Sequence, residues 1–198
     1  ENLISILLRD LIDNQADMIS PKIMYFAPKN VIWCAGGKFT SKFLLRNKHH
    51  GETQIDIGQF NKVIRCDYVP TCCVLIKKCL FDLNSVGLMD EKYFVYFDDS
   101  DWMWRARNKE VKLIYTPTVI LYHKVSSLTG GISLFTMRIF YRNRIYFIRK
   151  NLSGFAKVTN LFLTVAIIII KLVLNKLPRK YASEILSSLY NGFKLNVE

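Results

Sequence analysis

A run of aromatic residues leading into a cluster of aspartates constrains this chain most. The run from Tyr93 to Phe97 immediately precedes Asp98, Asp99 and Asp101, and two tryptophans and two arginines follow. This order predicts a helix that begins at the aspartates, because the unpaired N–H groups and partial positive charge of a helix N-terminus favour capping oxygens and anions. We expect one aspartate to cap the helix and the others to face a cleft.

The local pattern alone leaves two interpretations of these aspartates open. In one, they only cap an exposed helix, and Asp101 pairs with Arg105 one turn later, as side chains four residues apart on a helix do. In the other, they line a functional site. The context of the cluster favours the second interpretation, because several further motifs surround it in a set order.

These motifs run from residue 67 to residue 131. They are an apolar stretch with small residues at 71–77, Val86-Gly87-Leu88, Asp90-Glu91, the aromatic run, the acidic cluster, Arg105, and Tyr122-His123 followed by a Ser/Thr/Gly segment ending at Gly131. A Pro-Lys strand and a Trp-x-x-Gly-Gly turn at 33–37 extend the series upstream to about residue 18. Together they resemble the second half of the catalytic domain of family 2 glycosyltransferases, the inverting GT-A enzymes, and especially the rhamnosyltransferase-like branch that builds bacterial surface polysaccharides.

The resemblance implies a fold class and a function. The fold would be α/β, the C-terminal half of a GT-A mixed sheet flanked by helices, over residues 1–137, followed by a helical, basic and apolar tail over residues 138–198. The activity would be transfer of a sugar from a nucleotide-diphosphate sugar to a polysaccharide or lipid-linked acceptor, with inversion. Since the chain begins inside a predicted helix, we expect it to be the C-terminal piece of a longer protein.

The resemblance also implies roles for individual residues. Asp99 falls at the position of the general base, and Asp98 stands where the family usually has Glu. The other implied positions are Asp98, Asp101, Trp102, Arg105 and Thr71 around the acceptor, His123 at the metal or the diphosphate, and Ser126, Ser127, Thr129, Gly130 and Gly131 in a loop that closes over the donor. Trp102 and Trp104 point to different sides of a helix, so at least one of them is expected in the core.

The implied cofactor is Mg²⁺ or Mn²⁺. In the family, the metal-binding Asp-x-Asp lies in the nucleotide-binding half, upstream of every motif matched here. We therefore do not interpret Asp99-Ser-Asp101 as that motif, and we expect these 198 residues alone to lack the main metal ligands. A lone histidine at a strand end is otherwise more often structural than a ligand.

The regular elements expected along the chain follow from hydrophobic periodicity and from turn residues. They are a helix at 3–12, a strand at 18–26 with Pro21 at an edge or a strand start, a strand at 31–35, a polar loop at 46–61, a strand at 67–77, a short helix at 78–85, strands at 111–115 and 119–122, and helices from residue 134 onward. The five cysteines contain no Cys-x-x-Cys pair, which predicts buried thiols in a reducing compartment, the cytoplasm.

The formal charge of +12 lies mostly in the tail, where residues 138–198 hold 11 Lys or Arg against 2 Asp or Glu. The run 161–170 is apolar apart from Thr164, and it resumes after Lys171. We expect this tail to hold the protein at the cytoplasmic face of a membrane, as an interfacial helix or a spanning one; a buried core helix is the third interpretation. The basic residues expected to meet anionic headgroups are Arg142, Arg144, Arg149, Lys150, Arg179 and Lys180.

Two other functions compete with the enzyme. The chain is alternatively a truncated, inactive glycosyltransferase fragment or a membrane-bound interaction module. Basic residues mixed with aromatic ones at 138–150 also suit RNA, but no nucleic-acid motif accompanies them, so we expect no nucleic-acid partner.

Overall fold

A computed structural model describes residues 2–124 and 133–197 of the chain, which form a mixed α/β protein, as expected. The chain divides into two compact units. Unit one consists of residues 1–39, 47–89 and 102–125, and unit two consists of residues 40–46, 90–101 and 126–198. The division falls inside helix α2 (Asp98–Asn108), directly after Asp101.

Unit one is built on a five-stranded mixed sheet in which β2, β1, β7 and β5 are neighbours in that order and β6 also pairs with β1. The strands are β1 (Met18–Tyr25), β2 (Ile32–Cys34), β5 (Ile64–Cys66), β6 (Leu75–Ile76) and β7 (Leu113–His123), while β3 (Gly37–Phe39) and β4 (Asn47–His49) form a separate antiparallel ribbon. Strands β1 and β7 are parallel, and the other pairs of the main sheet are antiparallel.

Strand β1 is an interior strand of this sheet and Pro21 is its fourth residue, which corrects the expectation that Pro21 marks an edge or a strand start. Seven of its eight residues are buried. The register with β7 shifts between Pro21 and Lys22, so Pro21 lies opposite Thr116 and Lys22 opposite Ile120. Proline has no N–H to donate, and besides an edge or a strand start a sheet tolerates it at a bulge such as this one.

Strand β7 is one long strand rather than the two short ones expected at 111–115 and 119–122. Residues 117–119 have no partner in β1 because the register shifts between Thr116 and Ile120, and the strand continues through this bulge. Its last residue, His123, lies opposite Tyr25, the last residue of β1. The expectation that the second half of this segment delivers His123 at a strand end is therefore confirmed.

Residues 67–85 contain less regular structure than expected. The strand predicted at 67–77 is wrong, because only β6 within it is a strand and a turn occupies Thr71 and Cys72. Pro70 explains the interruption, since it has no N–H to donate to a ladder. The helix predicted at 78–85 is a single 3₁₀ turn, Lys78–Phe81, as nucleation of so short a helix is unfavourable.

The loop predicted at 46–61 is also partly wrong, because it includes β4. Strand β4 pairs with β3 directly after the turn at Gly36, whose φ is +78°. A Cβ atom on Gly37 would lie 2.8 Å from the carbonyl oxygen of Lys48, so the glycine allows the two strands to approach. The ribbon is held by backbone pairing between β3 and β4. The sequence of β4, Asn47–His49, has no apolar alternation from which a strand could be predicted.

Helix α1 (Leu3–Asp13) forms where its apolar period predicts it. The side chain of Asn2 caps it by accepting a hydrogen bond from the Ser5 N–H at 2.9 Å. Its inner face packs on the sheet in a cluster made of Leu7, Leu11, Ala16, Ile19 and Ile114. The helix at 3–12 and the strand at 18–26 are thus confirmed to within a residue.

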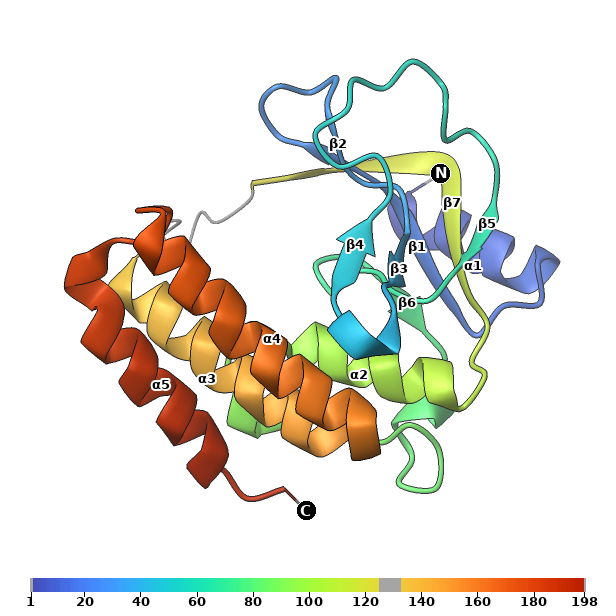
Figure 1. Ribbon diagram of the computed structural model, residues 1–198. Helices are drawn as coiled ribbons and strands as arrows, with labels where there is room; N and C mark the ends of the chain where they lie inside the picture. Colours follow the sequence, from blue (N-terminus) through green and yellow to red (C-terminus); the bar gives the residue numbers. More distant parts are fainter. Residues whose placement is uncertain (1, 125–132, 198) are drawn as a thin grey trace. The chain divides into compact units, whose positions relative to one another are not determined.

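Unit two contains three consecutive helices, α3 (Leu134–Asn151), α4 (Gly154–Val173) and α5 (Ala182–Lys194), shown in orange to red in Figure 1. Ser133 caps α3 by accepting a hydrogen bond from the Thr136 N–H. The core between the helices consists of Met137, Tyr141, Ile145, Ile168, Ile185 and Leu189. The helical tail expected from residue 134 is confirmed.

Gly192 lets α5 approach α3 closely. A Cβ atom there would lie 2.4 Å from the carbonyl oxygen of Arg142 and 2.8 Å from Cβ of Ile145. We expect Gly192→Ala to destabilise the protein by about 1–3 kcal/mol, because overpacking against backbone outweighs the ~1 kcal/mol that alanine gains in a helix. Urea unfolding monitored by circular dichroism measures the change. Asn191→Ala, at the exposed neighbouring position, is the control, and an equal or higher stability of Gly192→Ala would contradict the packing.

Candidate active site

The acidic cluster occupies the first turn of α2, as the sequence predicts. Asp98 and Asp99 are half-buried, whereas Asp101 is completely buried. The Oδ1 atom of Asp99 accepts hydrogen bonds from the Ser100 N–H at 2.6 Å and from the Ser100 hydroxyl at 3.2 Å. These contacts hold the Asp99 carboxylate at the N-terminal end of α2, the positive end of the helix dipole.

The aromatic segment before the cluster has an unusual backbone. Phe94, Tyr96 and Phe97 all have φ between +63° and +69°, a region that bulky residues rarely adopt. A 3₁₀ turn, Glu91–Tyr93, precedes them, and α2 follows directly. Backbone strain of this kind persists only where surrounding contacts hold it, and it concentrates at functional sites.

Asn143 of α3 supplies those contacts. Its side-chain amide is completely buried and donates to the carbonyl oxygens of Tyr93, Val95 and Tyr96 at 2.7–2.8 Å. The neighbouring Arg142 donates to the Tyr93 carbonyl oxygen at 3.0 Å. Four hydrogen bonds from two adjacent residues thus hold the strained segment that leads into the aspartates.

Asp101 is the centre of a buried polar network in unit two. Its carboxylate accepts hydrogen bonds from the Tyr93 hydroxyl at 3.0 Å, from the Asn151 amide at 2.7 Å and from the Lys150 ammonium at 3.1 Å. Burial and the nearby Asp101 carboxylate raise the pKa of Tyr93, so its hydroxyl remains a donor. A buried charge needs such partners, because an isolated carboxylate would cost several kcal/mol. The pairing of Asp101 with Arg105 stays a prediction, because these two residues belong to different units.

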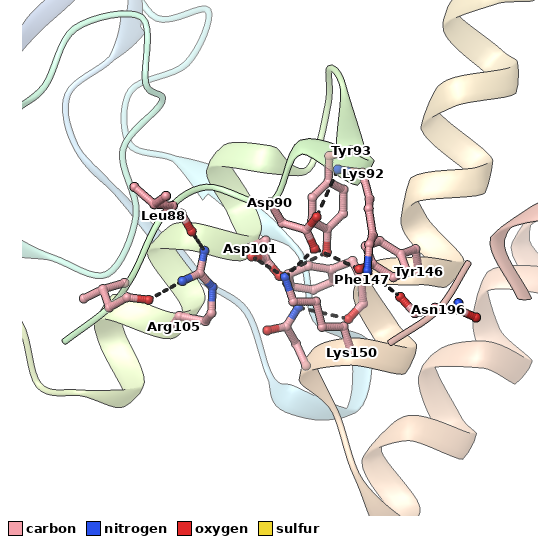
Figure 2. A network of polar contacts seen from close by, with 12 residues as sticks. Leu88, Asp90, Lys92, Tyr93, Asp101, Arg105, Tyr146, Phe147, Lys150 and Asn196 are labelled. Carbon is pink, nitrogen blue, oxygen red and sulfur yellow. Dashed lines mark hydrogen bonds and ion pairs between the residues drawn. The ribbon is translucent and has the colours of Figure 1, made fainter. Parts of the chain in front are cut away.

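Lys150 joins Asp101 to a second carboxylate. Figure 2 shows its ammonium group between Asp101 and Asp90, and its Nζ lies 2.6 Å from Oδ2 of Asp90. The Tyr146 hydroxyl donates to the same oxygen at 2.8 Å. Burial alone would raise the pKa of Asp90, but the hydrogen bonds from Lys150, Tyr146 and the Lys92 N–H outweigh it and hold the pKa below its usual value.

This shift gives the network a defined pH dependence. Because the folded pKa of Asp90 is depressed, its contribution to stability is present above the ordinary aspartate pKa, about 3.9, and is lost as pH falls through the lower folded value. We therefore expect Asp90→Asn to lower the free energy of unfolding at pH 7, and its difference from wild type to shrink below about pH 4. Urea unfolding at pH 7 and pH 3 tests this. Asp82→Asn, at an exposed turn, should differ little from wild type at either pH.

The sequence did not single out Asn143 or Lys150 for these roles. Asn143 stands in the polar run Arg142-Asn143-Arg144 amid aromatic residues of an otherwise amphipathic helix. A buried amide in such a position needs several partners, which is the signal that could have identified it. Nothing local indicates that the partners lie about 50 residues upstream.

Trp102 and Arg105, in unit one, both bind the segment Val86-Gly87-Leu88. The Trp102 indole N–H donates to the Gly87 carbonyl oxygen at 2.7 Å, and Arg105 donates to the carbonyl oxygens of Val86 and Leu88. The indole of Trp102 has no exposed surface for stacking on a sugar ring, so we do not carry it into the proposed site. Trp104 is buried too, which confirms that at least one of the two tryptophans belongs to the core.

His123 and Thr71 lie at other places in unit one. The ring of His123 is 4.5 Å from the ring of Trp33, and burial lowers the pKa of the imidazole, which favours its neutral form. Thr71 is half-buried in the turn before β6. Ser126, Ser127, Thr129, Gly130 and Gly131, the predicted donor loop, lie outside the described residues.

The described residues do not by themselves fit a divalent cation. Within residues 2–124 and 133–197, no group of three or more His, Cys, Asp or Glu side chains is placed to hold a metal ion. The imidazole ring of His123 lies against the ring of Trp33. We therefore derive no chemical step through a metal.

The cysteines only partly match the expectation. Cys34 and Cys66 are buried and Cys73 is half-buried, but Cys72 and Cys79 are exposed. Cys72 lies in a turn where the sequence predicts a strand, and Cys79 lies in the 3₁₀ turn Lys78–Phe81. Burial raises the pKa of Cys66 to about 11. This thiol therefore stays protonated and inert at neutral pH.

Four of the basic residues expected at lipid headgroups instead bind within unit two, which corrects that expectation. Arg142 binds carbonyl oxygens of residues 92 and 93, and Lys150 binds Asp90 and Asp101. Arg149 binds the carbonyl oxygens of Gly192 and Leu195 at 3.0 and 2.8 Å. Arg144 is buried against α4. Arg179 and Lys180 are exposed and remain candidates for a headgroup contact.

Comparison of the sequence with known proteins does not assign the chain to a family. No protein-family model and no curated protein matches the chain. The assignment of a function therefore depends on the motifs of the sequence and on the local structure that they form.

Proposed function

We propose that the full-length protein is an inverting glycosyltransferase of the GT-A type, acting at the cytoplasmic face of a membrane. It would transfer a sugar from a nucleotide-diphosphate sugar to a saccharide or lipid-linked acceptor in the synthesis of a surface polysaccharide. The observation that carries the proposal is the acidic start of α2 behind a strained aromatic segment, which Asn143 holds through three backbone carbonyl oxygens.

The chemistry needs one carboxylate at that place. An acceptor hydroxyl attacks the anomeric carbon from the face opposite the diphosphate, and the new C–O bond forms as the bond to the diphosphate oxygen breaks. The diphosphate leaves with the electron pair, and the hydroxyl proton passes to the base. A carboxylate kept ionised by a helix N-terminus is suited to accept this proton.

The structure favours Asp99 over Asp101 for this role. Asp101 is completely buried and already accepts hydrogen bonds from Tyr93, Lys150 and Asn151, so an acceptor hydroxyl cannot reach it. Asp99 is half-buried in the same helical turn. Asp101 would act as the anchor of that turn, and Asp98, shorter than the Glu of the resembled family, would lie beside the acceptor.

The internal binding of the basic residues on α3 counts against nucleic acid as a partner. Arg142, Arg144, Arg149 and Lys150 all donate to groups of unit two, so they do not form a basic surface for phosphates. The partners proposed are the nucleotide-diphosphate sugar, the acceptor and an anionic membrane surface. Mg²⁺ or Mn²⁺ would be held mainly by residues of the nucleotide-binding half that the resemblance places upstream.

The test is acceptor-dependent release of nucleoside diphosphate. The full-length protein is incubated with nucleotide-diphosphate sugars and a set of lipid-linked and soluble acceptors, and nucleoside diphosphate is measured with and without each acceptor. At least one donor and acceptor pair should release it well above the rate without acceptor. Absence of acceptor-dependent release from a folded full-length protein would instead favour an inactive fragment or an interaction module.

A further inference from the structure

Helix α4 has the reverse of the polarity expected for a helix in water. Two of its three buried residues are polar, namely Asn160, which is completely inaccessible, and Thr164, while the third is Ile168. Six large apolar side chains of α4 are exposed at spacings of three or four residues, which places them on one face: Phe155, Val158, Phe162, Val165, Ile169 and Val173. Ile170 and Lys171 are also exposed, and Lys171 is the one exposed charged residue of the helix. A helix at a water-exposed surface normally turns its apolar stripe inward and its polar side chains outward.

The inner face of α4 binds a buried arginine of α3. The Asn160 Oδ1 atom accepts hydrogen bonds from the Leu45 N–H at 2.8 Å and from Arg144 at 3.2 Å. Arg144 also lies 3.4 Å from the Thr164 hydroxyl and donates to the Leu45 carbonyl oxygen. Burial lowers the pKa of Arg144 to about 10, so the guanidinium is still charged at neutral pH. These contacts fix which face of α4 points inward.

We propose that the exposed apolar face of α4 inserts into one leaflet of a membrane, with the helix lying along the bilayer surface rather than crossing it. The proposal deepens the membrane location of the proposed function and does not depend on the transfer reaction. A helix of 20 residues is about 30 Å long, so its length alone would permit a crossing. The choice between the two orientations must come from what packs beside it.

Helix α3 excludes the crossing. It runs beside α4 (Figure 1) and carries Arg142, Asn143, Arg144 and Lys150 in its second half. If α4 crossed the bilayer, this charged helix would lie at the same depth, together with the aspartates that Lys150 binds. Ionised groups are rare within bilayers because they are costly there. Only the face of α4 that points away from α3 suits acyl chains.

The charges near the end of α4 favour lipid over a second copy of this chain. Lys171, Lys176, Arg179 and Lys180 are all exposed within ten residues. Against an anionic surface each strengthens binding several-fold, whereas two copies paired through this face would gain no opposite charge from each other's basic segment. Soluble proteins commonly expose single apolar side chains, whereas a contiguous patch of six large ones is typical of a surface that contacts a membrane or a partner.

The test compares Phe162→Asp with a matched control in the full-length protein. Phe162 is 69% exposed, and Leu83, which is 90% exposed in a loop of unit one, gives the control Leu83→Asp. Binding is measured by flotation with vesicles of phosphatidylcholine and phosphatidylglycerol. We expect Phe162→Asp to lower the vesicle partition coefficient about tenfold or more, because it replaces an apolar side chain by a charged one. The apolar substitution Phe162→Leu and the control Leu83→Asp should both keep the partition coefficient near that of the wild type.

Three results would overturn the proposal. Vesicle binding by Phe162→Asp at the wild-type level would show that another surface holds the membrane. Retention of the wild type in membranes after carbonate extraction would show a crossing helix, whereas release supports the surface orientation. A dimer that Phe162→Asp dissociates in the absence of lipid would show that a second copy covers the face. Phe162→Asp should still release nucleoside diphosphate in the presence of a soluble acceptor. Loss of membrane binding is thereby distinguished from loss of the proposed transfer reaction.

Discussion

Replacing Asp99 with Asn in the full-length protein should lower the rate of sugar transfer by about a hundredfold or more, with donor binding nearly unchanged. The size follows from the usual contribution of a general base. Asparagine keeps the shape of the side chain and can still accept the hydrogen bonds from Ser100, so the turn should remain folded. Only the ability to take the acceptor proton is lost. Transfer rates at saturating acceptor, together with calorimetric titration of the donor, measure the two effects separately.

The matched control is Asp98→Asn, a substitution of the same kind in the same helical turn at a similarly half-buried position. It should reduce transfer much less, because the proposed mechanism puts Asp98 beside the acceptor rather than in the proton transfer. Normal transfer by Asp99→Asn would refute its assignment as the base. A large loss in Asp98→Asn with little loss in Asp99→Asn would move the base to the neighbouring residue.

Replacing Lys150 with Met should cost about 3–5 kcal/mol of stability. Lys150 is the cation between Asp90 and Asp101, and its removal leaves two buried or half-buried carboxylates next to each other without their shared partner. Breaking a buried ion pair from one side costs this much because the remaining charge stays desolvated. Chemical denaturation followed by tryptophan fluorescence measures the change.

Two comparisons make this result specific. Lys176→Met, at an exposed position after α4, should change stability by no more than about 0.5 kcal/mol. The double variant Lys150→Met with Asp90→Asn should recover part of the loss, because one of the two unpaired charges is gone. If Lys150→Met is as stable as Lys176→Met, the network does not hold the start of α2.

Much of the secondary structure follows from local pattern. The apolar period of 3–12, the apolar run of 18–26 and the acidic start of α2 each predict their elements closely, because each signal lies within one segment. Where backbone pairing decides the structure, the pattern fails. Strand β4 has no apolar alternation, and the turn at Thr71 breaks an apolar run that reads as a strand.

The candidate site shows the same limit more sharply. The sequence places Asp98, Asp99 and Asp101 in one helical turn, but it does not say which of them faces inward. That depends on Asn151 and Lys150, which bind Asp101 from 50 and 49 residues away. Likewise, Arg144 and Arg149 look like surface charges in a basic tail, and only their partners show that they are internal.

The most direct test of the proposed reaction is the anomeric configuration of its product. The full-length protein is given the donor and acceptor pair that supports nucleoside diphosphate release, and proton NMR follows the anomeric signal of the transferred sugar from the first turnovers. A single displacement with Asp99 as the base predicts that the configuration is inverted relative to the donor. A product that retains the donor's configuration would contradict this mechanism.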